Sequence, residues 1–331
     1  MQIFRHHTQI PDGARGAVVA IGNFDGIHRG HQTLIGQAAA LARQLNAPLA
    51  VMTFEPHPRM FFQPNQPPFR LTSFRVKSRL LESLGVDLLF NLAFNHELAG
   101  LSAEDFVRDV LVTNLGACHV VVGDNFRFGN KRKGDIALLK QLGDELGLGV
   151  TTLARVTSPG DEPYSSSLVR DYLADGNPTR AGLLLGRYWE IEGRVQQGAK
   201  RGRDLGFPTA NMALGDSLRP AYGVYAVRAA LEEGDGSSHR WMPGVANLGI
   251  SPMFSYDEPL LETYLFDFDQ DIYGRHLRVA LVDYLRPEAN FRGLDELVAQ
   301  IRKDCDKARA TLSWEVWDQE WPVSPFISGK M

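Results

Sequence analysis

The sequence predicts a two-part α/β protein, in which a parallel sheet covered by helices precedes a small antiparallel barrel with a C-terminal helix. Three observations indicate this fold class. The chain has 331 residues, and since domains usually hold about 100–200 residues, two domains are expected. Up to about residue 155, short apolar runs alternate with helical patterns. From about residue 187, strand-like runs follow one another with only turns between them, which is typical of antiparallel sheets.

Five runs in the first part have the length and β-branched composition of buried strands. They are residues 17–21, 49–54, 86–90, 119–123 and 150–153. Strands that alternate with helices favour a parallel sheet with helices on both faces. In such sheets ligands bind beyond the carboxyl ends of the strands.

Helical patterns fill the gaps between these runs. Apolar residues recur at helical spacing between Leu34 and Leu45, as expected for one buried helix face. Residues 102–105 resemble a capping box that opens a helix ending at Gly116. Gly85 and Gly147 likewise follow candidate helix ends, because glycine readily adopts the left-handed conformation found there.

The second part has a different rhythm. Its predicted strands are residues 189–196, 222–230, 240–245, 260–267 and 277–285. A single helix over residues 293–310 follows them and closes the predicted barrel. Because the turn signal at 176–178 precedes the change of rhythm, we expect one domain over residues 1–183 and the other over 184–331.

Composition excludes several classes of protein. Hydrophobic residues make up 44 % and charged residues 22 % of the chain, as in ordinary globular proteins. The longest apolar runs have about five residues, whereas a membrane-spanning helix needs about twenty. The first residues lack the apolar stretch of a secretory signal, and only two cysteines are present, so a reducing cytoplasm is expected. A net charge of −4, without a basic excess in either half, argues against nucleic acid as a partner.

A glycine-rich loop follows the first predicted strand and leads into a helix. Gly22, Gly26 and Gly30 allow close approach of the backbone to a ligand, and the helix N-terminus favours phosphate. The spacing fits neither a P-loop nor Gly-x-Gly-x-x-Gly. His28 and His31 could donate hydrogen bonds to a triphosphate, although a metal-binding pair or two exposed histidines would fit the same spacing.

Residues 22–31, Gly-Asn-Phe-Asp-Gly-Ile-His-Arg-Gly-His, resemble the signature of nucleotidylyltransferases and, more specifically, of the prokaryotic bifunctional riboflavin kinase/FAD synthetase family. Three further segments of the family follow in order, at 53–58, 122–129 and 164–170. The last of these departs from the family pattern by Ser167 and Leu168. The resemblance implies a Rossmann-like nucleotidylyltransferase domain followed by a barrel like that of riboflavin kinases.

The resemblance also implies roles for residues of the first part. His28 and His31 would act in catalysis by stabilising the phosphates of ATP. The implied nucleotide-binding residues are Gly22, Asn23, Asp25, Gly30, Asn125, Ser165, Ser166, Arg170 and, in the second part, Lys200. Asp25 would assist a magnesium ion or serve as a turn carboxylate. Phe62 and Phe128 would stack on the flavin or act as core aromatics.

In the second part, residues 202–211 resemble the Gly-x-Pro-Thr-Ala-Asn element of riboflavin kinases. The resemblance implies that Thr209 and Asn211, both oxygen ligands, hold a magnesium ion with ATP. It makes Glu262 the general base that accepts the proton of the ribityl hydroxyl. A strand-end carboxylate satisfied by solvent is the structural alternative. Arg286 would contact flavin or phosphate.

The expected reactions are riboflavin + ATP → FMN + ADP and FMN + ATP → FAD + pyrophosphate, each with Mg²⁺. ATP is a co-substrate, no redox cofactor is expected because flavins are substrate and product, and no membrane partner is expected. Ile250 and Met253 each replace a hydroxyl of the family pattern, so an adenylyltransferase with a weakened kinase half is one alternative. A non-catalytic flavin-binding regulatory protein is the other. The sequence predicts no oligomeric state.

Overall fold

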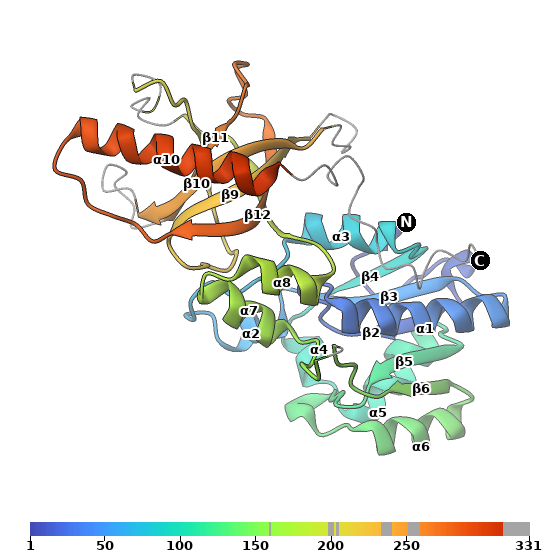
Figure 1. The fold of residues 1–331 in the computed structure, drawn as a ribbon. Helices are drawn as coiled ribbons and strands as arrows, with labels where there is room; N and C mark the ends of the chain where they lie inside the picture. Colours follow the sequence, from blue (N-terminus) through green and yellow to red (C-terminus); the bar gives the residue numbers. More distant parts are fainter. Residues whose placement is uncertain (159, 198–201, 203–204, 233–239, 251–258, 314–331) are drawn as a thin grey trace. The chain divides into compact units, whose positions relative to one another are not determined.

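The computed structural model divides the chain into two compact units (Figure 1). It describes all residues except 159, 198–201, 203–204, 233–239, 251–258 and 314–331. Among the described residues, the first unit comprises 1–67 and 74–165, and the second comprises 68–73 and 166–313. The expected division between residues 183 and 184 concerns the two activities and stays a prediction.

The first unit is built on a six-stranded parallel sheet in the order β1-β4-β3-β2-β5-β6. The strands are β1 (Gln2–Phe4), β2 (Val18–Ile21), β3 (Leu49–Glu55), β4 (Leu88–Ala93), β5 (His119–Gly123) and β6 (Gly149–Leu153). The predicted parallel sheet is thus confirmed. Strand β4 begins later than predicted because the N–H of Val86 bonds to the carbonyl of Leu81 and completes the preceding helix.

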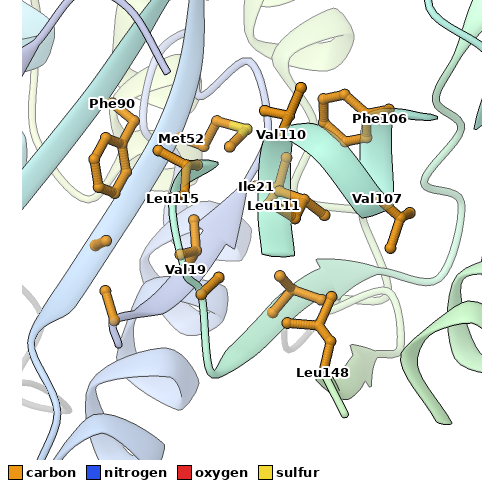
Figure 2. Close-up of a cluster of buried hydrophobic side chains, with 14 of the residues drawn as sticks. Val19, Ile21, Met52, Phe90, Phe106, Val107, Val110, Leu111, Leu115 and Leu148 are labelled. Carbon is orange, nitrogen blue, oxygen red and sulfur yellow. The ribbon is translucent and has the colours of Figure 1, made fainter. Parts of the chain in front are cut away.

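Helices cover the sheet, and two clusters of buried side chains lie between the layers. The helical segments are η1 (Asp12–Ala14), α1 (Arg29–Leu45), α2 (Pro58–Phe62), α3 (Phe74–Ser83), α4 (His96–Gly100), α5 (Ala103–Asp105), the π-helix η2 (Phe106–Asn114), η3 (Asn130–Arg132) and α6 (Ile136–Leu146). Val19 and Ile21 belong to one cluster, whereas Val18 and Ala20 belong to the other. Since side chains alternate along a strand, the two clusters lie on opposite faces of the sheet. Figure 2 shows the cluster under η2.

Local signals set the helix ends as predicted. The Ser102 hydroxyl accepts a hydrogen bond from the Asp105 N–H and donates one to its carboxylate. Gly116 has φ 61°, and the N–H of Ala117 returns to the carbonyl of Leu111. Gly147 ends α6 in the left-handed region. These ends are fixed by residues close in sequence, which is why the sequence could predict them.

The second unit is built on an antiparallel sheet in the order β7-β12-β9-β10-β11-β8. Its elements are α7 (Ser166–Ala174), α8 (Pro178–Leu185), β7 (Trp189–Arg194), β8 (Ala210–Ala213), β9 (Gly223–Leu231), β10 (Met242–Ile250), β11 (Pro259–Leu265), β12 (His276–Arg286) and α10 (Leu294–Leu312). A bridge between Gln196 and Asn211 brings the two edge strands together. The sheet therefore closes into the small barrel that the sequence predicts.

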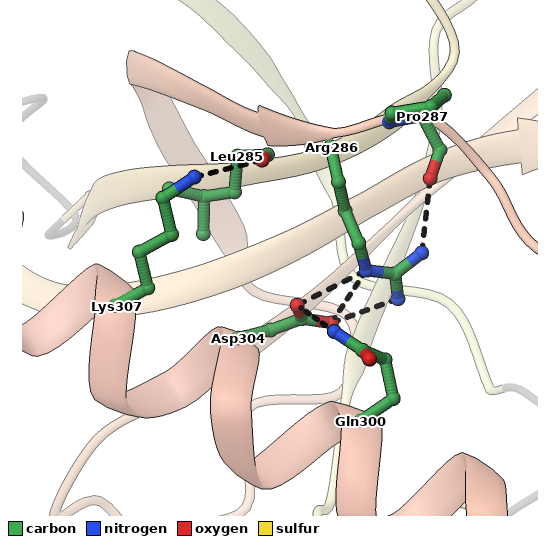
Figure 3. A network of polar contacts seen from close by, with 6 residues as sticks. All are labelled: Leu285, Arg286, Pro287, Gln300, Asp304 and Lys307. Carbon is green, nitrogen blue, oxygen red and sulfur yellow. Dashed lines mark hydrogen bonds and ion pairs between the residues drawn. The ribbon is translucent and has the colours of Figure 1, made fainter.

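Helix α10 is held on the sheet by apolar packing and by a polar network (Figure 3). The Arg286 guanidinium on β12 donates to both carboxylate oxygens of Asp304 on α10, at 2.8 to 3.0 Å. Gln300 also donates to this carboxylate, and the Lys307 ammonium donates to the carbonyl of Leu285. The bidentate pair fixes the helix in both position and direction.

Residues 68–73 belong to the second unit although they precede most of the first in sequence. Their carbonyls serve as acceptors there: the Trp189 indole N–H donates to Leu71, and the Leu218 N–H donates to Arg70. The Ser73 hydroxyl donates to the Glu192 carboxylate. The second unit is therefore assembled from two separate stretches of chain.

Candidate active sites

The first candidate site is the loop between β2 and α1. Phe24, Gly26 and Ile27 all have positive φ, at 49°, 83° and 41°. A non-glycine residue holds this conformation only where its surroundings enforce it. The side chains of Phe24 and Ile27 are fully buried and anchor the loop. The backbone of residues 22–28 is thus held in one shape directly before the N-terminus of α1.

His28 and His31 come together at this helix N-terminus. His28 is the N-cap, and its Nδ1 accepts the N–H of His31 at 3.3 Å. This hydrogen bond assigns the proton of neutral His28 to Nε2. The two rings stack with centroids 3.7 Å apart. The structure therefore joins the two histidines that the sequence predicts to act as a pair.

His31 is electrostatically constrained. Burial, followed by the electrostatic effects of His28 and Lys77, lowers its pKa well below the ordinary value, so its ring is neutral at pH 7. Its Nδ1 is buried and has no hydrogen-bond partner among the described residues. A buried polar atom without a partner is costly, and an oxygen of a bound phosphate would supply one.

Gly30 brings the segment that begins at Tyr164 close to the histidines. A Cβ atom at Gly30 would lie 3.2 Å from the His28 ring and 3.2 Å from the Cβ of Tyr164. The first turn of α1 therefore packs closely against both, and a larger residue at this position would require them to shift by a few tenths of an ångström. Two motifs far apart in sequence meet here within the first unit.

Sequence reasoning missed Lys77 and gave no role to Thr53, the first residue of the segment 53–58. The Lys77 ammonium donates to the Asn23 carbonyl at 2.8 Å and to the Thr53 hydroxyl at 3.3 Å. The Thr53 hydroxyl also donates to Asn23, at 3.1 Å. A lysine on an amphipathic helix is usually solvated, so only the fold could have identified this one.

Other predicted residues of the first unit have mixed environments. Asp25 is buried within the loop, and Asn125 is exposed beyond the carboxyl end of β5. Phe62 on α2 is 64 % exposed, which leaves its ring available for stacking. Phe128 is 6 % exposed and stacks on Phe126 in the core. A flavin contact at either ring stays a prediction.

The residues predicted to clamp phosphate are divided between the two units. Ser165 is the last residue of the first unit, and Ser166 begins α7. The Nε of Arg170 donates to the Phe69 carbonyl at 2.8 Å, and its guanidinium lies 5.2 Å from the centre of the Phe69 ring. Arg170 is therefore tied to residues 68–73, and its contact with nucleotide stays a prediction.

The second candidate site is a cavity of about 380 Å³ beside β8 and β11. Gly202, Thr209 and Asn211 line it, as does Thr263, which the sequence did not single out. Asn211 Oδ1 and Thr263 Oγ1 are buried and have no hydrogen-bond partner among the described residues. Oxygen atoms of this kind suit a hard divalent cation and the phosphates that it binds.

Glu262 does not line this cavity but is linked to it through the sheet. On β11 it pairs in register with Asn211 on β8 and with Asn247 on β10. It alternates with Tyr264, whose ring contacts Phe207 and Phe266. Burial raises the pKa of the Glu262 carboxyl, which makes its carboxylate a stronger base than an exposed one.

The remaining predicted residues of the second unit, where they are described, do not line this cavity. Lys200 and Met253 lie outside the described residues. Ile250 is exposed at the end of β10. Arg286 is engaged by Asp304, and its contact with flavin or phosphate stays a prediction.

The described residues lack two features. They contain no group of three or more His, Cys, Asp or Glu side chains that could hold a metal ion. In the same part of the chain, no helix has the length and apolar character needed to cross a membrane.

Comparison with known proteins assigns each half to a family. The FAD synthetase family model matches residues 10–168, and the riboflavin kinase family model matches residues 185–312. The bifunctional riboflavin kinase/FMN adenylyltransferase of Escherichia coli (strain K12) is 42 % identical over 289 residues, which are 87 % of this chain and 90 % of that protein. Its namesake in Pseudomonas fluorescens is 42 % identical over 311 residues, 94 % of this chain and 97 % of that protein.

A solved structure shares the whole fold. It is titled a macrolide-efflux protein from Streptococcus pneumoniae, and it is 32 % identical to this chain with a TM-score of 0.81. The match covers 95 % of this chain and 99 % of that one. The two-unit architecture is therefore shared beyond the curated relatives.

Proposed function

This chain belongs to the family of bifunctional riboflavin kinase/FMN adenylyltransferases, and from that membership we propose how its residues divide the two reactions. The chain transfers a phosphoryl group from ATP to riboflavin, giving FMN and ADP, and an adenylyl group from ATP to FMN, giving FAD and pyrophosphate. Both reactions consume ATP, which supports a cytoplasmic location.

In adenylyl transfer, the first unit positions ATP and stabilises developing charge. A phosphate oxygen of FMN is already a nucleophile, so no side chain needs to form a covalent intermediate. The Nε2–H of His28 and the N–H of the neutral His31 ring donate hydrogen bonds to the phosphates. The N-terminus of α1 adds a partial positive charge.

Further residues complete the adenylyl-transfer site. The backbone at Gly22, Asn23 and Gly30 receives the phosphates, and Ser165, Ser166 and Arg170 clamp them. Asp25 and Asn125 hold the rest of the nucleotide, and Phe62 and Phe128 contact the flavin. The exposure of Phe62 and the neighbourhood of Gly30 and Tyr164 support these roles.

In phosphoryl transfer, the second unit supplies a base and a cation-binding pair. The Glu262 carboxylate accepts the proton of the ribityl 5′-hydroxyl as its oxygen attacks the γ-phosphorus. Asn211 Oδ1 and the Thr209 hydroxyl would hold Mg²⁺ beside the ATP phosphates, and the buried, unpartnered Oδ1 fits that use. When bound, Mg²⁺ neutralises phosphate charge. Lys200 and Arg286 bind nucleotide and flavin.

One observation carries this assignment: both predicted sites include a buried polar atom that lacks a hydrogen-bond partner among the described residues. Of the several atoms of this kind, His31 Nδ1 lies in the first site and Asn211 Oδ1 lies in the second. An unsatisfied buried atom is costly to a protein unless a ligand completes it. Two such atoms, each in a predicted site, support one nucleotide site per unit.

The test is an assay of the purified chain with riboflavin, ATP and Mg²⁺, followed by chromatographic separation of the flavins. We expect FAD from the parent chain. Glu262→Gln should abolish FMN formation and leave the conversion of added FMN to FAD intact. His28→Ala combined with His31→Ala should do the reverse. Equal loss of both activities in either variant would contradict the division.

A further inference from the structure

Lys77 is a charged residue in a place where charge is costly. It lies on α3, whose other buried residues are Val76 and Leu81. Lys77 itself is only 2 % exposed. A buried ammonium is tolerated only when hydrogen bonds or opposite charges replace its hydration. A leucine or methionine would fill the same space without this cost, so the position calls for a reason beyond packing.

The contacts of Lys77 join three elements. Its ammonium donates to the Asn23 carbonyl after β2 and to the Thr53 hydroxyl near the end of β3. The Thr53 hydroxyl donates a hydrogen bond to the same Asn23 carbonyl. The Thr53 hydroxyl thus accepts one hydrogen bond and donates another. The Asn23 carbonyl accepts two hydrogen bonds, one from Lys77 and one from Thr53.

The held carbonyl belongs to the loop that ends at His28. The next residue, Phe24, has φ 49°, and Ile27 has φ 41°. Such a backbone persists only when its surroundings over-determine it. The peptide between Asn23 and Phe24 is planar, so fixing its carbonyl also fixes the direction of the Phe24 N–H. Lys77 therefore contacts this loop from α3 through the carbonyl of Asn23.

The charge of Lys77 also reaches the histidine pair. It is among the causes that lower the pKa of His31, after burial and His28. The titratable residues of the loop 22–28 itself are Asp25 and His28. The positive charge of Lys77, next to the loop, favours an anion bound to that loop.

We propose that Lys77 is a positioning residue of adenylyl transfer: its ammonium fixes the Asn23 carbonyl, and through it the loop 22–28, in the shape and potential that receive the ATP triphosphate. The inference rests on the proposed role of that loop. Lys77 acts through the backbone of residues 23–24 and through the field at His31.

The decisive variant is Lys77→Met, which keeps the length of the side chain and removes its charge and donors. We expect the KM for ATP in the conversion of FMN to FAD to rise by about tenfold. The conversion of riboflavin to FMN should stay within about twofold of the parent, because that site lies in the other unit. Lys140→Met, the same change at an exposed lysine of α6, should alter neither reaction.

A merely structural lysine would give a different result. Loss of folded protein lowers the maximal rate and leaves the KM for ATP unchanged. Lys77→Arg, which restores charge and donors, should bring the KM back to within about threefold of the parent. A parent-like KM in Lys77→Met would overturn the proposal. If Lys77→Met does not fold, Thr53→Val is used instead, since it removes the hydroxyl that bonds to both Lys77 and Asn23. An unchanged KM for ATP in Thr53→Val would count equally against the proposal.

A second readout needs no activity. Nuclear magnetic resonance of labelled histidine rings in the ligand-free chain should show a higher pKa for His31 in Lys77→Met than in the parent or in Lys140→Met. An unchanged His31 titration would remove the electrostatic part of the proposal. If the parent chain itself made no FAD from FMN, the proposed function would fail, whereas the titration would still report on Lys77.

Discussion

At the scale of single residues, burial acts in opposite directions on the two predicted catalytic groups. It disfavours the charged form of each, and so it lowers the pKa of His31 and raises that of Glu262. For a donor to phosphate, a neutral ring suffices. For a general base, a raised pKa gives more affinity for the proton, provided that the carboxylate is still ionised at working pH. Both shifts suit the chemistry proposed for each unit.

The Glu262 shift predicts an acid limb in the kinase pH profile. Its carboxylate is the active form, so kcat/KM for FMN formation should fall as pH drops through its pKa. Because burial raises that pKa above the ordinary value of 4.5, the fall should occur at a higher pH than for an exposed glutamate. Initial rates between about pH 4 and about pH 8 measure it. A profile that stays flat down to the ordinary value would contradict the role.

Gly30 offers a test of the histidine pair without touching it. Gly30→Ala should lower kcat/KM for FAD formation by about tenfold, because the new Cβ would press on the His28 ring and on Tyr164, each 3.2 Å away. Alanine has a higher helix propensity than glycine, so the lower activity would not result from unfolding of α1. Gly13→Ala, at a position with nothing within 4 Å, is the control. Equal activity of the two variants would show that the rings tolerate the contact.

At the scale of elements, the sequence predicted what local chemistry decides. The run at 119–123 coincides with β5, and the caps at Ser102 and Gly147 stand where expected. Strand β8 was missed because its residues also fit a ligand-bearing turn and alternate too briefly to show a period. Lys77 was missed because its burial depends on Asn23 and Thr53, which lie far away in sequence. The histidine pair was predicted because a helix start brings its members together locally.

The attachment of α10 predicts a stability effect. Asp304→Ala should lower the free energy of unfolding of the second unit by about 3 kcal/mol, because it leaves the part-buried Arg286 guanidinium without its bidentate partner. Urea unfolding followed by fluorescence measures this. Asp306→Ala, at an exposed position of the same helix, should cost less than about 0.5 kcal/mol. If both cost the same, the network of Figure 3 does not hold α10.

At the scale of the whole molecule, neither unit is one continuous stretch of the sequence. Residues 68–73 leave the first unit, join the second and return to begin α3. Their carbonyls satisfy donors that would otherwise be buried without partners, above all the indole N–H of Trp189, a residue 1 % exposed. The second unit therefore does not contain, within residues 166–313, every acceptor that its core requires.

This dependence can be measured by comparing one substitution in two contexts. Trp189→Phe removes the indole N–H and some apolar volume in both the full chain and a fragment of residues 166–331. Only the full chain has the Leu71 carbonyl that accepts this N–H, at 2.7 Å. The substitution should therefore lower the free energy of unfolding by about 1 kcal/mol more in the full chain than in the fragment. The cavity that the smaller phenylalanine leaves is the same in both and cancels from the comparison. Unfolding curves followed by loss of riboflavin kinase activity give both values. An equal cost in the two contexts would mean that residues 68–73 do not stabilise the second unit through Trp189.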